Sequence, residues 1–156
     1  MTRGETTRSA NACPERYVIK TNLSPRVPRR HHRIHHRHST PPRTATILVV
    51  DDDPEVREIV SDILLDYGHQ VLAADGGTEA LRLIDATPGI DLMITDVRMP
   101  DISGLELAAR ARRAREGLRV ILISGYFPGV DVGARVLLKP FRMAELHAAV
   151  QAELGG

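Results

Sequence analysis

Apolar residues follow two alternating patterns from Thr46 to the end of the chain. Short runs of branched aliphatic residues, such as the one at 47–50, are typical of strands that are buried on both faces. Longer segments with apolar residues three and four positions apart are typical of helices. The pattern predicts strands at 47–50, 70–74, 91–95, 119–123 and 136–138, and helices at 54–68, 76–86, 103–117 and 143–154. Strands that alternate with helices indicate an α/β fold with a parallel sheet and right-handed crossovers.

Local residue choices mark where several of these elements begin and end. Asp53 followed by Pro54 is typical of a helix start, and Ser103 is a suitable N-cap for the third helix. Segment 126–134 is rich in Pro and Gly, which leaves too little room for a full helix between the last two strands. The helix residues expected to face the core are Val56, Ile59, Val60, Ile63, Leu64, Ala80, Leu81, Ile84, Leu105, Leu107, Ala108, Ala111, Leu146, Val150 and Leu154.

The charge of the chain is divided unevenly between a basic first part and an acidic remainder. The net charge at pH 7 is only +1. Residues 1–44 hold ten Lys and Arg against two Glu, together with five of the seven His. The other residues hold eleven Lys and Arg against eighteen Asp and Glu. The overall charge therefore says little about binding partners, because it is the sum of two opposite parts.

The basic part, residues 1–44, has no helical or strand periodicity and contains five Pro. We expect a disordered Arg/His-rich arm at 1–44 and a folded domain at 45–156, because the arm buries too little apolar surface to offset its ordering entropy. Clustered His could bind metal and Arg could bind nucleic acid, but no aromatic residue separates the basic ones and no zinc-module spacing occurs. A composition rich in Arg and poor in acids also occurs in transit peptides. We interpret residues 1–44 as a solvated tail or as upstream sequence included by a misassigned start.

Cysteine use and hydropathy bear on the compartment of the protein. Cys13 is the only cysteine, so no intrachain disulfide can form, which fits a reducing compartment. No apolar run approaches the roughly twenty residues needed to cross a bilayer. The start of the chain also lacks the apolar segment of a secretory signal. We therefore expect a cytoplasmic protein without a membrane partner.

Polar residues follow four of the five predicted strands at the point where each strand ends. Asp51 and Asp52 follow the first strand, Asp96 the third, Ser124 the fourth and Lys139 the fifth. The carboxyl ends of parallel strands lie along one edge of a sheet, where sites form. Three adjacent carboxylates repel one another unless a cation is present, and Mg²⁺ is a hard ion that prefers oxygen ligands. A carboxylate nucleophile beside Mg²⁺ and Lys is suited to accepting a phosphoryl group, and we expect Asp96 to be that nucleophile.

The motifs around these residues resemble the receiver domain of bacterial response regulators in two-component signalling. The matching motifs are Ile-Leu-Val-Val-Asp51-Asp52-Asp-Pro, Ile-Thr-Asp96-Val-Arg-Met-Pro100-Asp-Ile-Ser-Gly104, Ile-Leu-Ile-Ser124-Gly125 and Leu-Leu-Lys139-Pro140-Phe141. The resemblance covers about residues 45–154 and is to receivers of the stand-alone, single-domain type. It implies a flavodoxin-like, doubly wound five-stranded parallel sheet in the order 2-1-3-4-5.

The resemblance also implies the chemistry of the nucleophile and its neighbours. Asp96 would accept a phosphoryl group from a sensor histidine kinase or a histidine phosphotransfer protein. Ser124 would hydrogen-bond the phosphoryl group, and Lys139 would pair with its charge. The peptide bond before Pro140 would be cis, a form that proline makes accessible.

The magnesium ligands are implied in the same way. Asp52 would bind Mg²⁺ directly and Asp51 mainly through water. Asp96 would be a further ligand, together with the backbone carbonyl of Arg98. Mg²⁺ is thus the expected cofactor.

One segment departs from the pattern of the family. Ser124 and Lys139 are fifteen positions apart, several fewer than is usual, so the fourth helix is expected to be shortened or missing. Many receivers report phosphorylation through an aromatic residue shortly before the Lys, and that position is Val136 here. Tyr126 and Phe127 are candidates to replace this aromatic residue from the loop.

Three other functions compete with a phosphorylated receiver. An Mg²⁺-dependent aspartyl-phosphate phosphohydrolase usually has a second Asp two residues after the nucleophile, where Arg98 stands here. A receiver-fold interaction module that works without phosphorylation does not require the full acidic, Ser and Lys set. Nucleic-acid binding would rest on the arm alone.

The expected output follows from the end of the chain, which comes directly after the last helix. We expect a non-enzymatic phosphorelay switch that acts through an unknown partner protein. A terminal receiver cut from a hybrid kinase would have the same sequence pattern.

Overall fold

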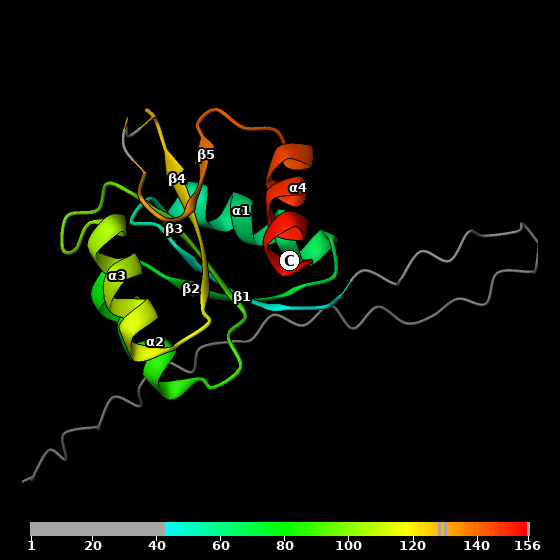
Figure 1. Cartoon of the computed structure of the whole chain (residues 1–156). Helices are drawn as coiled ribbons and strands as arrows, with labels where there is room; N and C mark the ends of the chain where they lie inside the picture. Colours follow the sequence, from blue (N-terminus) through cyan, green and yellow to red (C-terminus); the bar gives the residue numbers. More distant parts are fainter. Residues whose placement is uncertain (1–42, 128, 130, 156) are drawn as a thin grey trace, which may run out of the picture.

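Strands and helices alternate along the described residues (43–127, 129 and 131–155) of this computed structural model until the fourth strand, which leads to the fifth without an intervening helix (Figure 1). The elements are β1 Thr46–Val50, α1 Pro54–Asp66, β2 Gln70–Ala74, α2 Gly77–Ala86, β3 Leu92–Asp96, α3 Gly104–Ala114, β4 Arg119–Ser124, β5 Arg135–Leu138 and α4 Met143–Leu154. The predicted α/β class is confirmed.

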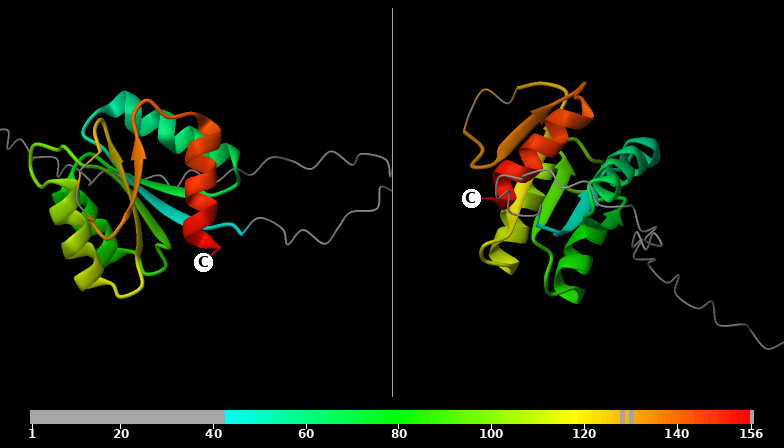
Figure 2. Two further views of the ribbon diagram at one scale, coloured as in Figure 1. Left: turned by 45° about the horizontal axis from the view of Figure 1, so that its top comes forward. Right: turned by 90° about the vertical axis from the view of Figure 1, so that its right-hand side faces the viewer.

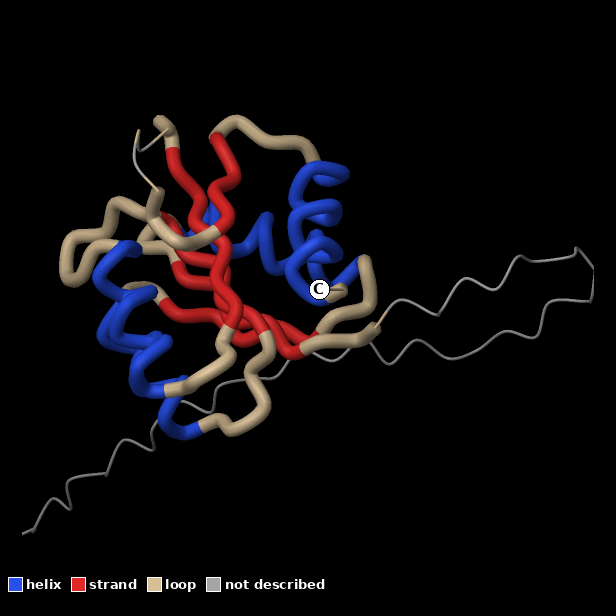
Figure 3. The backbone as a smooth tube through the Cα atoms, viewed as in Figure 1, coloured by secondary structure: helices blue, strands red, loops and turns tan. Residues whose placement is uncertain are grey.

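The five strands form one sheet in the order β2-β1-β3-β4-β5, and every neighbouring pair is parallel. This is the doubly wound order predicted from the sequence (Figure 3). The register aligns the carboxyl ends of the inner strands, with Val50 opposite Thr95 and Asp96 opposite Ile123. Ser124 in turn lies opposite Leu138. The residues that end β1, β3, β4 and β5 therefore meet at one edge of the sheet.

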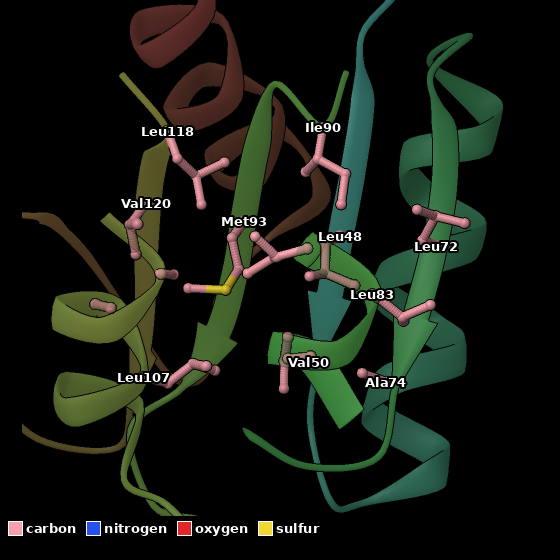
Figure 4. Close-up of a cluster of buried hydrophobic side chains, with 14 of the residues drawn as sticks. Leu48, Val50, Leu72, Ala74, Leu83, Ile90, Met93, Leu107, Leu118 and Val120 are labelled. Carbon is pink, nitrogen blue, oxygen red and sulfur yellow. The ribbon is translucent and has the colours of Figure 1, made fainter. Parts of the chain in front are cut away.

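The sheet is covered by helices on both faces, with α2 and α3 on one face and α1 and α4 on the other (Figures 1 and 2). Each strand alternates between the two core clusters, since Leu48 and Val50 face α2 and α3 whereas Ile47 and Val49 face α1 and α4. Figure 4 shows the first cluster, in which Met93 on β3 lies between Leu48 on β1 and Val120 on β4. Apolar side chains on both faces explain the continuous hydrophobic runs of the strands.

The segment between β4 and β5 covers part of the core, and no helix lies among its described residues. Val132, Ala134 and Val136 pack against the cluster that α2 and α3 cover. The guanidinium of Arg112 on α3 donates a hydrogen bond to the carbonyl of Gly133 at 2.8 Å, which ties the segment to that helix. The prediction that the helix between β4 and β5 would be shortened or missing is confirmed for the described residues.

Two side chains that were expected to face the core are exposed instead. Ile59 on α1 is 58% exposed and Leu105 on α3 is 40% exposed. Ile59 lies about 100° around the helix axis from the buried Val60, beyond the arc that touches the sheet. Leu105 lies just outside the corresponding arc of α3 for the same reason. The buried stripes of α1 and α3 are therefore narrower than the spacing of their apolar residues predicted.

The predicted arm falls almost entirely on residues 1–42, which lie outside the described residues, and its disorder stays a prediction. Among the residues that the structure describes, no helix has the length and apolar character that crossing a membrane requires.

Candidate functional site

Three carboxylates from two strands meet at the carboxyl edge of the sheet. Asp51 and Asp52 follow β1, and Asp96 is the last residue of β3. One carboxylate oxygen from each lies within 4.8 Å of the others. The side chains of Asp51 and Asp96 are only 5% and 12% exposed, whereas Asp52 is exposed. The predicted acidic residues are thus brought together, with two of them shielded from solvent.

The surroundings of Asp51 shift its pKa. Burial raises its pKa above the ordinary value of 3.8, and the charges of Asp96 and Asp52 act in the same direction. The backbone N–H of Asp53, which donates to Asp51 Oδ1 at 2.9 Å, and the ammonium of Lys139 oppose that increase in the pKa. A carboxylate with a raised pKa beside two others is a group that a bound cation would stabilise in its charged form.

Lys139 supplies a positive charge to this cluster from β5. Its Nζ lies 3.5 Å from Asp96 Oδ1 and 3.9 Å from Asp51 Oδ2. The bond between Lys139 and Pro140 is cis, as the resemblance implied. Lys139 is one of only two lysines in the sequence, whereas the other cations of the folded part are arginines. The compact ammonium suits the narrow space between two carboxylates better than a planar guanidinium would.

Ser124, the last residue of β4, lies at the same edge but is directed to its own loop. It is 3% exposed. Its Oγ donates to the carbonyl of Tyr126 at 2.7 Å and accepts from the N–H of Tyr126 at 3.2 Å. The backbone N–H of Lys139 donates to the Ser124 carbonyl at 2.8 Å, which fixes the end of β5 beside it.

The loop from β3 to α3 is held close to Asp96 by the start of α3. The N–H of Gly104 donates to the Val97 carbonyl at 2.8 Å. A Cβ at position 104 would lie 2.1 Å from the carbonyl oxygen of Asp96, so only glycine allows this approach. Gly104, which the resemblance included, thus has a steric reason to be there.

The far end of the same loop is attached to α2. The carboxylate of Asp101 accepts hydrogen bonds from the N–H groups of Gly77 at 3.2 Å and Thr78 at 2.9 Å. These bonds lower the pKa of Asp101 to about 2, with the Thr78 bond as the largest cause. The N-cap of α2 is Gly76, which has no side chain to offer, so Asp101 caps the helix from another element.

Arg98 is exposed in this loop, and its guanidinium lies over the ring of Tyr126 with Cζ 4.9 Å from the ring centroid. Both residues line an open pocket of about 550 Å³ next to Asp52, with Met99 and Leu105 on its apolar wall. The loop therefore places Arg98 at the rim of the acidic cluster. The predicted ligand role of its carbonyl stays a prediction.

Two residues that position the site were not identified from the sequence. Arg57 on α1 donates from Nη1 to the carbonyl of Asp51 at 2.7 Å and fixes the turn that presents both first acids. Asp101 caps α2, as described above. The one sequence clue to the second was the pair Gly76-Gly77, which leaves a helix start without a capping side chain.

Comparison with known proteins agrees with this geometry. Residues 47–151 match the family model described as response regulator receiver domain. The response regulator MprA of Mycolicibacterium vanbaalenii is 39% identical over 115 residues, which cover 69% of this chain and 49% of the relative. The DNA-binding transcriptional regulator NtrC of Azospirillum brasilense is 37% identical over 117 residues, 70% of this chain and 24% of the relative. This chain spans about a quarter to a half of the length of these relatives.

Solved structures share the fold as well. The receiver domain of the hybrid histidine kinase CckA has a TM-score of 0.64 at 37% identity, covering 70% of this chain and 99% of that domain. The response regulator TrrA of Thermotoga maritima, solved in complex with Mg²⁺ and BeF, has a TM-score of 0.65 at 33% identity, with coverage of 70% and 99%.

Proposed function

The chain belongs to the response regulator receiver family of two-component signalling, and on that premise we propose that Asp96 accepts a phosphoryl group from a sensor histidine kinase or a histidine phosphotransfer protein. The observation that carries this proposal is the largely buried Asp96 carboxylate at the end of β3, with the ammonium of Lys139 3.5 Å from Oδ1. A nucleophile and a cation for the incoming charge thus share one edge of the sheet.

The reaction transfers a phosphoryl group from a phosphohistidine to the carboxylate of Asp96. An oxygen of Asp96 attacks phosphorus, the bond between phosphorus and the imidazole nitrogen of the donor breaks, and that nitrogen keeps the electron pair. The product is an acyl phosphate on Asp96. Lys139 offsets the charge on the transferred oxygens, and Ser124 can donate one hydrogen bond to them.

Mg²⁺ fits the residues that surround Asp96. Receiver domains bind Mg²⁺ at an acidic pocket, and three carboxylate oxygens within 4.8 Å of one another are a suitable oxygen-rich donor set for this ion. Asp51, Asp52 and Asp96 would hold it, together with the carbonyl of Arg98. When bound, the ion would neutralise negative charge where the carboxylates and the phosphoryl group meet.

The chemistry of position 98 disfavours a phosphohydrolase. An acid/base residue must gain and lose a proton near neutral pH, whereas a guanidinium stays protonated. Arg98 is also stacked on Tyr126, at the rim of the pocket. We therefore propose a non-enzymatic switch in the cytoplasm whose output passes to a partner protein.

The proposal is tested by incubating the full chain with acetyl phosphate and Mg²⁺ and measuring the intact mass. We expect a gain of one phosphoryl group that is absent without Mg²⁺ and in Asp96→Asn. The matched control is Asp91→Asn, a strand-edge carboxylate at the opposite end of β3 that accepts from the N–H of Thr46. A wild-type mass that stays unchanged with acetyl phosphate and with phosphoramidate would refute the proposal and favour an interaction module.

A further inference from the structure

The outer face of α1 combines one apolar side chain with a row of acids. Ile59, near the middle of the helix, is 58% exposed. Around it lie four exposed acids at intervals of three or four positions, Glu55, Glu58, Asp62 and Asp66. Residues at these intervals lie next to one another along a helix, so the five side chains share one face of α1, which we call the acidic face.

The acids of this face are not paired within the described part of the chain. None of the ion pairs there includes them, and the last turn of α1 holds no basic residue. Glu58, Asp62 and Asp66 follow one another at intervals of four positions, where like charges repel. Asp66 also ends α1, where a negative charge opposes the helix dipole. A positively charged partner would relieve both effects.

The basic first part of the chain joins the sheet beside the end of this face. The N–H of Ala45 donates to His69 Nδ1 at 3.3 Å, and the carbonyl of Ala45 accepts from the N–H of Gln70 at 2.9 Å. His69 comes only three residues after Asp66, the last residue of α1. The residues that precede Ala45 therefore start out next to the carboxyl-terminal end of the acidic face.

Segment 29–38 is complementary to the acidic face in charge and in spacing. It reads Arg-Arg-His-His-Arg-Ile-His-His-Arg-His, with four Arg, no acid and a single apolar residue, Ile34. Arginines stand four and one positions before Ile34 and three positions after it, which are Arg30, Arg33 and Arg37. Acids stand at the same intervals from Ile59, and these are Glu55, Glu58 and Asp62. A helical form of the segment would therefore present the same pattern with the opposite charge.

The chain between the two surfaces is long enough to bring them together. Arg37 precedes Ala45 by eight positions, which span up to about 26 Å at 3.3 Å per residue. The thirteen residues of α1 extend over only about 20 Å. The direction also agrees, because a segment parallel to α1 would have Arg37 near Asp62, toward the end of α1 at which the chain enters.

We propose that segment 29–38 docks on the acidic face of its own chain, parallel to α1, with Ile34 against Ile59. The three cation-acid pairs are Arg30 with Glu55, Arg33 with Glu58 and Arg37 with Asp62. Single ion pairs on a surface contribute little. Three pairs and an apolar contact act together here, and the short connection to β1 gives the segment a high effective concentration. The sequence favoured a solvated tail because it shows no partner, whereas the exposed face of α1 supplies one.

Paramagnetic broadening in NMR spectra of the full chain tests this docking. Cys13, the only cysteine, is replaced by Cys13→Ser, and a nitroxide is attached at His35→Cys, beside Ile34. We expect the amide signals of 55–62 on α1 to lose intensity in about 50 mM NaCl and to recover in about 1 M NaCl, where the screening length falls to about 3 Å. The same spectra show whether each variant is folded.

Charge reversal separates docking from the mere tethering of the spin label. Glu58→Lys with Asp62→Lys should restore the amide signals of 55–62. Adding Arg33→Glu with Arg37→Glu to these changes should broaden the signals again, because the charges are then exchanged. The matched control is Asp85→Lys with Glu116→Lys, which makes the same change of net charge at exposed acids on α2 and after α3. The control should leave the broadening as it is in the wild type.

Three results would overturn the proposal. Broadening that is equal in the wild type and in Glu58→Lys with Asp62→Lys would come from tethering alone. A fourfold variant that stays sharp would show that the listed charges do not pair. Broadening in an isotope-labelled chain that carries no nitroxide, mixed with spin-labelled chains, would assign the acidic face to the arm of a second copy. None of these results depends on phosphorylation of Asp96, so the proposed function is tested separately.

Discussion

Asp51 is a buried carboxylate within the acidic site. Its side chain is 5% exposed, and burial raises its pKa before the neighbouring carboxylates add to the effect. The sequence placed Asp51 beside Asp52 but did not show which of the two side chains is buried. The difference arises because one side chain points into the protein and the other is exposed.

Asp51→Asn should therefore stabilise the metal-free protein at pH 7. Asn removes the buried charge and keeps an oxygen that can accept from the N–H of Asp53. We expect the free energy of unfolding in EDTA to rise, measured by urea denaturation, because burial disfavours the charged carboxylate.

Two comparisons make this prediction specific. Asp52→Asn, at an exposed carboxylate, should change the stability less. Mg²⁺ should raise the thermal midpoint of the wild type more than that of Asp51→Asn, because a ligand stabilises only the state that binds it. A lower stability of Asp51→Asn in EDTA would mean that Lys139 and the Asp53 N–H outweigh the burial.

Among the helices, α2 anchors a loop of the site, because its N-terminus binds Asp101 in the loop that carries Arg98. Its N-cap, Gly76, has no side chain, and its first N–H groups are bonded by Asp101 from the loop that carries Arg98. A Cβ at Gly76 would lie 2.9 Å from Asp101 Oδ2, so the absent side chain is what allows the contact. Helix periodicity located α2 correctly, but a cap supplied by another element has no local sequence pattern.

Asp101→Ala should lower the stability by about 1 kcal/mol in urea denaturation at pH 7, as the loss of a helix cap does. Asp101→Asn should lose less, because it keeps an acceptor. Asp85→Ala, at an exposed acid in the last turn of α2, is the matched control and should cause little change. The pKa of Asp101 is lowered to about 2, so its contribution should be complete above pH 3.8 and disappear as the pH falls toward 2. Equal effects of both Asp101 variants would argue against the cap.

At the scale of the whole molecule, a pair of histidines lies where three elements meet. His69, between α1 and β2, is 3% exposed, and its Nδ1 accepts from the N–H of Ala45 at 3.3 Å. His147 on α4 stacks on Tyr67, and its charge acts on His69. Burial, followed by the charge of His147, lowers the pKa of His69 below 6.5.

The stability of the fold should accordingly decrease as the pH falls below about 6.5. Below that pH the unfolded chain binds a proton at His69 more readily than the folded chain does, so acid favours unfolding. Urea denaturation between pH 5.5 and 7.5 measures the effect. His69→Asn keeps an acceptor for Ala45 and should flatten the dependence, whereas an equally steep decrease in that variant would assign it to other groups.

From periodicity and turn residues we could predict the order of strands and helices, the shortened or missing helix between β4 and β5, and the four positions at which polar residues end the strands. These follow from periodicity and from turn residues, which are local properties of the chain. The parallel order of the sheet then brings Asp51, Asp96, Ser124 and Lys139 to one edge, as predicted.

How those residues are connected depends on packing in three dimensions. The stack of Arg98 on Tyr126 and the cap by Asp101 each join segments distant in the sequence, whose packing no local pattern encodes. The Ser124 hydroxyl is bonded within its own loop, a side-chain direction that the residue type alone does not specify. The buried stripe of each helix was likewise narrower than its spacing suggested, as Ile59 shows, because the sheet contacts only part of the helix surface. The sequence of strands and helices sets which residues lie at the edge of the sheet. The atoms that meet there depend on side-chain rotamers and on neighbours distant in the sequence.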